Sequence, residues 1–208
     1  MINKLKIIIL GDINVGKSTF LESYITDYNI KTKIENTLIS DLFCKDIIYN
    51  NEKIKLLFYD FSGTCQSKNL NKGYFDKLDG LILMFDLTNK NSIKNIKSWV
   101  EYSRESVCRY NNIYPVPCII VGNKIDLIEN IDDIIPKTYF INEKIDLNEE
   151  YLPCSSIQKT DTATPKICID KLLDKIKSDE QIRKMRSDNI IIDDTIIIDN
   201  STCSCISQ

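Results

Sequence analysis

The chain has 208 residues, of which 43% are hydrophobic, and this length predicts one domain followed by a tail. Its 27 Lys and Arg residues against 30 Asp and Glu residues give a net charge of −3, which excludes a global positive field for binding nucleic acid. The absence of histidine excludes imidazole acid–base catalysis and every zinc site that needs a histidine ligand.

The cysteines and the N-terminal segment predict a cytosolic protein. Six of the eight cysteines are scattered singly, without the spacing of a metal site or of a secreted disulfide framework. The apolar stretch that ends at Leu10 is too short for the core of a signal peptide and for a membrane span. We therefore expect reduced thiols and no targeting for secretion.

Five strands are predicted along the chain. The continuous apolar run 7–10 indicates a strand buried on both faces. The runs 41–49 and 54–60, joined by two asparagines, predict a β-hairpin, and 81–87 and 118–121 predict two further buried strands.

Two segments have apolar residues at helical spacing. The segment 91–110 is predicted to be a helix with Asn91 as its N-cap. The segment 165–186 opens with Pro165 and is predicted to be the closing helix on the sheet. Because buried strands alternate with helices, we predict an α/β fold with a mainly parallel, doubly wound sheet.

Residues 11–18, Gly-Asp-Ile-Asn-Val-Gly-Lys-Ser, match the phosphate-binding pattern G-x-x-x-x-G-K-[ST] between a predicted strand and a helix. Its glycines let the backbone curl so that successive N–H groups face phosphates. Lys17 would reach the β- and γ-phosphates and the Ser18 hydroxyl would bind Mg²⁺. This motif by itself does not separate ATP from GTP.

A second motif predicts which nucleotide base is bound. Residues 123–126, Asn-Lys-Ile-Asp, follow an apolar strand and match the N-K-x-D guanine motif of small GTPases. The Asp126 carboxylate can accept from the ring N–H and the exocyclic amine of guanine, whereas adenine presents the opposite pattern. Asp60 and Gly63 form a D-x-x-G motif, in which the carboxylate organises Mg²⁺ and the glycine N–H meets the γ-phosphate.

These motifs resemble those of the Ras superfamily, and most closely its Rab branch, over residues 4–180. The segments 55–60 and 83–88 look like Rab strands, and 93–99 looks like the Rab helix that follows. The resemblance implies a P-loop NTPase domain with a mainly parallel six-stranded sheet and helices on both faces. It also implies a molecular switch that binds GTP or GDP with Mg²⁺ and hydrolyses GTP.

The resemblance assigns further residues to the site. Thr37 matches the switch I threonine that senses Mg²⁺ and the γ-phosphate, with Thr32 as the weaker candidate, and Tyr28 suits the guanine face. Lys17 and Thr64 are the expected catalytic residues, and Ser18, Thr37 and Asp60 the expected Mg²⁺ ligands. The expected nucleotide contacts are Gly11, Asp12, Asn14, Val15, Gly16, Lys17, Ser18, Thr19, Tyr28, Thr37, Asp60, Gly63, Asn123, Lys124, Asp126, Ser155, Ser156 and Ile157.

Three positions depart from the family pattern. Thr64 stands where the family has the glutamine that orients the attacking water, and Gln66 lies two residues too late to replace it. Ile13 replaces a small residue and would crowd the γ-phosphate and any incoming arginine finger, while Ile157 replaces a lysine. Thr64 and Ile13 together predict slow hydrolysis and a protein that lingers with GTP bound.

The domain is expected to cover residues 1–186, and 187–208 to form a flexible tail. Cys203 and Cys205 fit a Rab-like C-x-C motif, or Cys205 begins a C-a-a-X box, and both patterns predict prenylation. The acidic tail has no polybasic cluster, so a second lipid on Cys203 is the expected design. This predicts a peripheral protein on the cytosolic face of an internal membrane.

The leading prediction is a monomeric Rab-like switch in vesicle trafficking, which meets effectors, exchange factors and GTPase-activating proteins through its switch regions. A pseudo-GTPase that serves as a constitutive binding module, and a Ras- or Rho-type signalling protein, remain alternatives. An ATP-dependent kinase is the least favoured alternative, because the guanine motif at residues 123–126 would then have no function.

Overall fold

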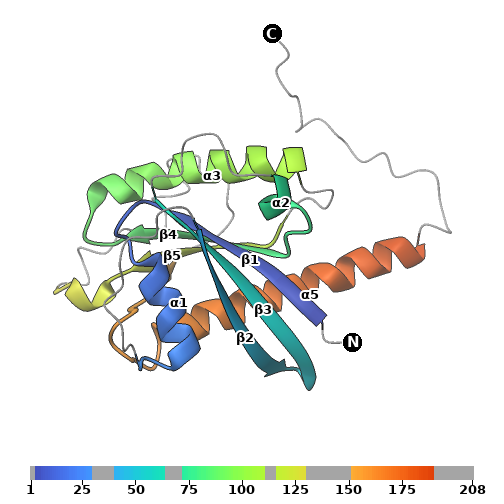
Figure 1. The fold of residues 1–208 in the computed structure, drawn as a ribbon, viewed down its shortest axis with the longest axis horizontal. Coiled ribbons are helices and arrows are strands. Elements are labelled where there is room, and N and C mark those ends of the chain that lie inside the picture. The colour runs from blue at the N-terminus through green and yellow to red at the C-terminus, as the bar shows by residue number, and fades with distance from the viewer. Residues whose placement is uncertain (1–2, 30–39, 64–71, 111–115, 130–150, 190–208) are drawn as a thin grey trace, which may run out of the picture.

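Strands and helices alternate along the chain, as Figure 1 shows. The computed structural model describes residues 3–29, 40–63, 72–110, 116–129 and 151–189. The elements in chain order are β1 (Asn3–Gly11), α1 (Lys17–Thr26), β2 (Ser40–Tyr49), β3 (Glu52–Phe61), α2 (Lys72–Phe75), β4 (Gly80–Asp86), α3 (Lys90–Tyr110), β5 (Cys118–Asn123), the 3-10 turn η1 (Ile125–Leu127), β6 (Leu152–Pro153) and α5 (Pro165–Asn189).

Within the described residues, the strands form one six-stranded sheet in the order β2-β3-β1-β4-β5-β6. β2 pairs with β3 in antiparallel orientation, and every other neighbouring pair is parallel. The predicted α/β fold with a mainly parallel six-stranded sheet is therefore confirmed. The predicted hairpin is also confirmed: Asn50 and Asn51 have positive φ angles of 49° and 64°, as a two-residue turn of the favoured hand requires.

Helices cover both faces of the sheet (Figure 1). Successive residues of a strand point to opposite faces, and β1 divides its apolar side chains accordingly. Ile7 and Ile9 join the core cluster under α1 and α5, whereas Ile8 and Leu10 join the cluster under α2 and α3. All four side chains have no exposed surface, which explains why β1 is apolar without alternation.

The start of α3 differs from the prediction that Asn91 is its N-cap. The helix begins at Lys90, and the Oδ1 of Asn89 accepts a hydrogen bond of 3.0 Å from the backbone N–H of Asn91. Asn89 therefore caps the helix and Asn91 lies in its first turn. The closing helix α5 begins at Pro165 as predicted and continues to Asn189 instead of ending at 186.

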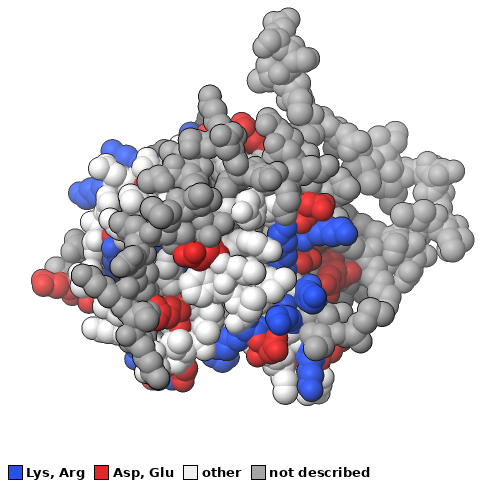
Figure 2. All heavy atoms as spheres, in the orientation of Figure 1, with Lys and Arg blue, Asp and Glu red and all other residues white. Residues whose placement is uncertain are grey.

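Charged side chains of both signs are mixed over the described part of the face in Figure 2. Within the described ranges, no helix combines the length and the apolar character needed to cross a bilayer.

Candidate functional site

The phosphate-binding motif lies in the loop between β1 and α1, at the carboxyl end of the parallel strands. Asn14 and Gly16 have left-handed φ angles of 63° and 96°, which curl the backbone before the helix. Asparagine tolerates this region and glycine enters it freely. A Cβ on Gly16 would lie 2.4 Å from the Nδ2 atom of Asn123, so the contact with β5 also requires glycine here.

Lys17 begins α1 and folds back over this loop. Its ammonium donates hydrogen bonds of 2.9 Å to the Gly11 carbonyl and 2.8 Å to the Asp12 carbonyl, and its side chain is almost fully buried. The loop thus holds one positive charge at its centre, where it is suited to attract an anion.

Ser18 and Asp60 meet although they lie 42 positions apart in the sequence. The Ser18 hydroxyl donates to the Oδ2 atom of Asp60, which is buried near the end of β3. A hydroxyl and a carboxylate are the hard oxygen ligands that suit Mg²⁺ when phosphates complete its shell. The residues present therefore fit the expected magnesium site.

Gly63 lies against the phosphate loop. A Cβ at Gly63 would be 2.0 Å from the backbone nitrogen of Ile13 and 2.2 Å from the carbonyl carbon of Asp12, so no other residue fits without a backbone shift. The Ile13 side chain itself is 47% exposed.

Asn123 connects the two predicted motifs. Its Nδ2 atom donates a 2.9 Å hydrogen bond to the Val15 carbonyl in the phosphate loop, and its Oδ1 atom accepts a 2.9 Å bond from the Ser156 hydroxyl. The neighbouring Ser155 hydroxyl donates at 2.6 Å to the Oδ1 atom of Asp126. Three segments that lie far apart in the sequence are thus joined around one buried amide.

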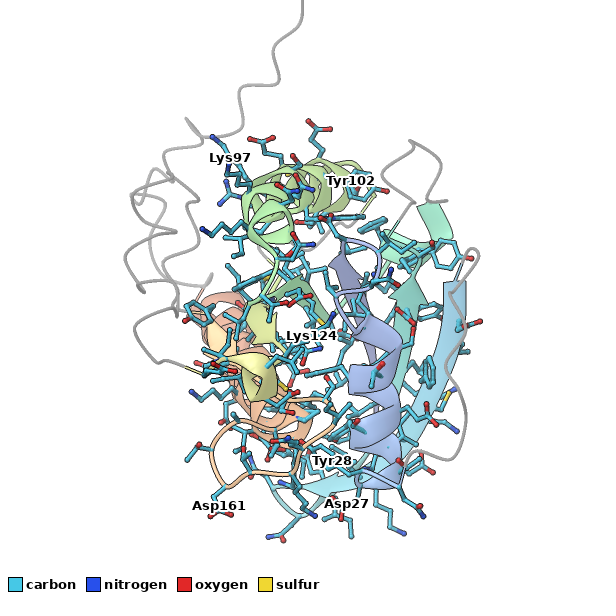
Figure 3. All side chains as sticks on the ribbon, turned by 90° about the vertical axis from the view of Figure 1, so that its left-hand side faces the viewer. Asp27, Tyr28, Lys97, Tyr102, Lys124 and Asp161 are labelled. Atoms are coloured by element: carbon cyan, nitrogen blue, oxygen red, sulfur yellow. The ribbon has the colours of Figure 1, made fainter. Side chains whose placement is uncertain are left out.

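Lys124 and Tyr28 border this cluster at different ends of α1, as Figure 3 shows. The Lys124 ammonium forms a 2.8 Å ion pair with Asp86, a buried carboxylate at the end of β4. The Tyr28 hydroxyl donates at 2.9 Å to the Ser155 carbonyl. Burial raises the pKa of the Tyr28 phenol, so it stays protonated and able to donate.

Three residues of the site were not predicted from the sequence. Asp86 pairs with Lys124, and both Asn95 and Trp99 of α3 bind the Asp12 carboxylate. A buried indole N–H needs an acceptor, which was the available signal for Trp99, but the sequence does not identify that acceptor.

Several expected site residues cannot be placed. Thr37 and the alternative Thr32, Thr64 and Gln66, and the tail residues Cys203 and Cys205 lie outside the described residues. Thr19 lies in α1, where its carbonyl accepts a 2.8 Å hydrogen bond from the Ser23 hydroxyl. Ile157 follows the Ser155 loop and is 60% exposed.

Comparisons with known proteins agree with this geometry. A model of the Ras family matches residues 6–171. The Ras-related protein RabH of Dictyostelium discoideum is 33% identical over 74% of this chain and 73% of its own length. The Ypt/Rab-type GTPase YPT7 of Saccharomyces cerevisiae is 31% identical over 62% of this chain and 61% of its own length.

A larger relative shares the same segment. The Ras and EF-hand domain-containing protein of Danio rerio is 29% identical over 76% of this chain, which spans only 23% of that relative's length. The family model covers more than half of the chain, and the six-stranded sheet with its phosphate loop has the matching architecture. The chain therefore belongs to the Ras family of small GTPases, as a divergent and Rab-like member.

Proposed function

We propose that this protein is a switch that binds GTP and GDP with Mg²⁺ and hydrolyses GTP slowly. The observation that carries the proposal is the buried Asn123 amide, which ties the phosphate loop at Val15 to Ser156, beside Asp126. This arrangement supports one pocket with a phosphate end and a base end.

Each end has its own chemistry. At the phosphate end, Lys17 supplies a positive charge, and Ser18 and Asp60, with Thr37, would hold Mg²⁺. The metal, when bound, neutralises part of the phosphate charge. At the base end, Asp126 accepts from guanine, while Ser155, held by Tyr28, keeps that carboxylate in place.

Nucleotide extraction tests the base assignment. Protein purified without added nucleotide should release GTP and GDP on denaturation, identified by chromatography, and no adenine nucleotide. Asp126→Ala should lose the bound guanine nucleotide, because two hydrogen bonds to a charged acceptor disappear. Asp161→Ala, which removes an exposed carboxylate from the loop before α5, should retain it. Co-purification with ATP would refute the proposal.

Slow hydrolysis is proposed from two side chains. Thr64 lacks the reach of the glutamine that orients water, and Ile13, within the phosphate loop, has a half-exposed branched side chain. In single-turnover assays of bound GTP, Thr64→Gln combined with Ile13→Ser should hydrolyse faster than the natural chain. Equal rates would contradict this explanation. Undetectable turnover of the natural chain with activating proteins present would favour the pseudo-GTPase alternative, which the same two residues support.

The cellular role is proposed from the Rab-like relatives. We place the protein in vesicle trafficking as a monomer on the cytosolic face of an internal membrane, where GTP-ordered switch regions bind effectors and regulatory proteins. Intact mass of protein from native cells should show prenyl groups on Cys205 and Cys203. Two unmodified thiols would refute membrane attachment. Effectors confined to signalling would favour the Ras- or Rho-type alternative.

A further inference from the structure

The carboxylate of Asp12 in the phosphate loop binds to α3. Asp12 follows Gly11 directly, and both oxygens of its side chain are bound by α3. The Oδ1 atom accepts a 2.7 Å hydrogen bond from the Nε1 atom of Trp99, and the Oδ2 atom accepts a 2.8 Å bond from the Nδ2 atom of Asn95. The loop before α1 lies beneath α3 in Figure 3.

The negative charge of the Asp12 side chain is unfavourable in a loop that is proposed to bind phosphates. A carboxylate that turned toward bound phosphates would repel them, and the repulsion would grow with the number of phosphate charges. Two donors on α3 instead hold the Asp12 carboxylate on the side of the neighbouring helix. A hydrogen bond to a charged acceptor is stronger than one between neutral groups, so this orientation is well maintained.

Trp99 is a rigid anchor for that bond. Its side chain is 1% exposed and packs in the cluster under α3, with its ring edge-on to Tyr102 at a centroid distance of 6.1 Å. Tryptophan has a single donor and no acceptor, so a buried indole that lost Asp12 would leave its N–H unsatisfied. The anchor therefore favours one position of Asp12.

The backbone of Asp12 passes this constraint on to Lys17. The carbonyl of Asp12 accepts the 2.8 Å hydrogen bond from the Lys17 ammonium, and the Asp12–Ile13 peptide is the surface against which Gly63 packs. A shift of Asp12 would therefore move an acceptor of the phosphate-binding lysine.

We propose that Trp99 and Asn95 are positioning residues for triphosphate binding: they turn the Asp12 carboxylate away from the phosphates and hold its carbonyl against Lys17. The inference rests on the proposed guanine-nucleotide function. It assigns to α3 a role in nucleotide affinity that acts through Asp12, without contact between α3 and the nucleotide.

A double-mutant cycle tests whether the effect passes through Asp12. Dissociation constants of fluorescent GTP and GDP analogues are measured for the natural chain, Trp99→Phe, Asn95→Ala and Asp12→Ala, and for each α3 variant combined with Asp12→Ala. Trp99→Phe should weaken GTP binding about tenfold, the size of one lost hydrogen bond to a charged group, and GDP binding less. In the Asp12→Ala background, both α3 substitutions should leave GTP affinity unchanged.

Asn91→Ala, at an exposed asparagine one turn earlier in α3, is the matched control and should bind GTP as the natural chain does. Trp99 is the only tryptophan of the chain, so tryptophan fluorescence reports on this side chain alone. Its emission should shift when GTP binds, and Asp12→Ala should abolish that shift.

Three results separate the possible failures. Equal weakening with and without Asp12, or equal weakening for GTP and GDP, would show that α3 only supports the fold and would overturn the positioning role. Asn95→Ala provides the same comparison should Trp99→Phe fail to fold. Absence of guanine-nucleotide binding in the natural chain would instead overturn the proposed function, and this inference with it.

Discussion

At the scale of single residues, the phosphate loop depends on positions where backbone angle and available space coincide. Gly16 has a left-handed φ of 96°, and the amide of Asn123 occupies the place that a side chain would take. The same amide donates to Val15. One glycine therefore decides both the curl of the loop and its connection to the segment 123–126, which we propose binds the guanine base.

Gly16→Ala should lower the free energy of unfolding by about 1–3 kcal/mol through backbone strain and should abolish measurable GTP binding, since Asn123 is displaced. Thermal unfolding and a binding titration measure the two effects. Gly80→Ala is the control, because its new Cβ would meet side-chain atoms and no backbone: the ends of Ile176 and Leu172 at 3.0 Å and 3.2 Å, and the Cγ1 atom of Ile7 at 3.5 Å. It should keep GTP affinity. Normal GTP binding by Gly16→Ala would contradict the account.

The cysteines provide a second residue-scale prediction. A hydrogen bond with Cys168, together with burial, raises the pKa of the Cys154 thiol, which directly precedes the Ser155 loop. At pH 8 Cys154 should thus remain a protonated and unreactive thiol, whereas exposed Cys44 and Cys108 should react with iodoacetamide. Peptide mapping by mass spectrometry, with urea-unfolded protein as the control, measures this difference. Rapid alkylation of Cys154 in the native chain would refute it.

At the scale of elements, a tertiary contact sets the start of α3. The buried Ser92 hydroxyl accepts a 3.0 Å hydrogen bond from the Asp86 N–H and donates at 2.9 Å to the Asn89 carbonyl. This contact docks the first turn of α3 on the end of β4. The helical register, and with it the direction of Trp99 and Asn95, follows from that docking.

The corrected cap can be tested with two similar substitutions. Asn89→Ala removes the side-chain acceptor at the start of α3 and should lower the free energy of unfolding by about 1 kcal/mol. Asn91→Ala keeps the capping hydrogen bond, because only its backbone takes part, and should cost much less. Urea denaturation of both variants measures the difference, and a larger loss for Asn91→Ala would restore the original prediction.

At the scale of the whole molecule, the site gathers at the carboxyl ends of neighbouring parallel strands. Gly11, Asp60, Asp86 and Asn123 come from the ends of β1, β3, β4 and β5. A ligand that contacts all four strand ends would bind only to the folded state, because these strand ends separate when the sheet unfolds. Ligand binding and global stability should therefore be coupled.

GTP with Mg²⁺ at about a thousand times its dissociation constant should stabilise the fold by about 4 kcal/mol. The unfolding midpoint should rise accordingly in a thermal scan, and ATP with Mg²⁺ at the same concentration should leave it unchanged. Chelation of Mg²⁺ should remove part of the gain, since Ser18 and Asp60 would lose their shared ligand. An equal rise with ATP would contradict guanine selectivity.

The sequence alone determined the features whose physics is local. The apolar run of β1, the asparagine turn between β2 and β3, the phosphate motif and the N-K-x-D segment each contain their own signal within a few neighbouring residues. From these signals follow the α/β class, the parallel sheet and the family.

Only the tertiary structure decided which distant side chains meet. The pairs Asp12–Trp99, Asp86–Lys124 and Asn123–Ser156 join residues 87, 38 and 33 positions apart. The cap of α3 is Asn89 and not the predicted Asn91, because the contact of Ser92 with β4 sets where the helix begins. The type of a polar residue predicts that its buried side chain requires a hydrogen-bond partner. Which residue becomes that partner depends on how the helices and strands pack across the sheet.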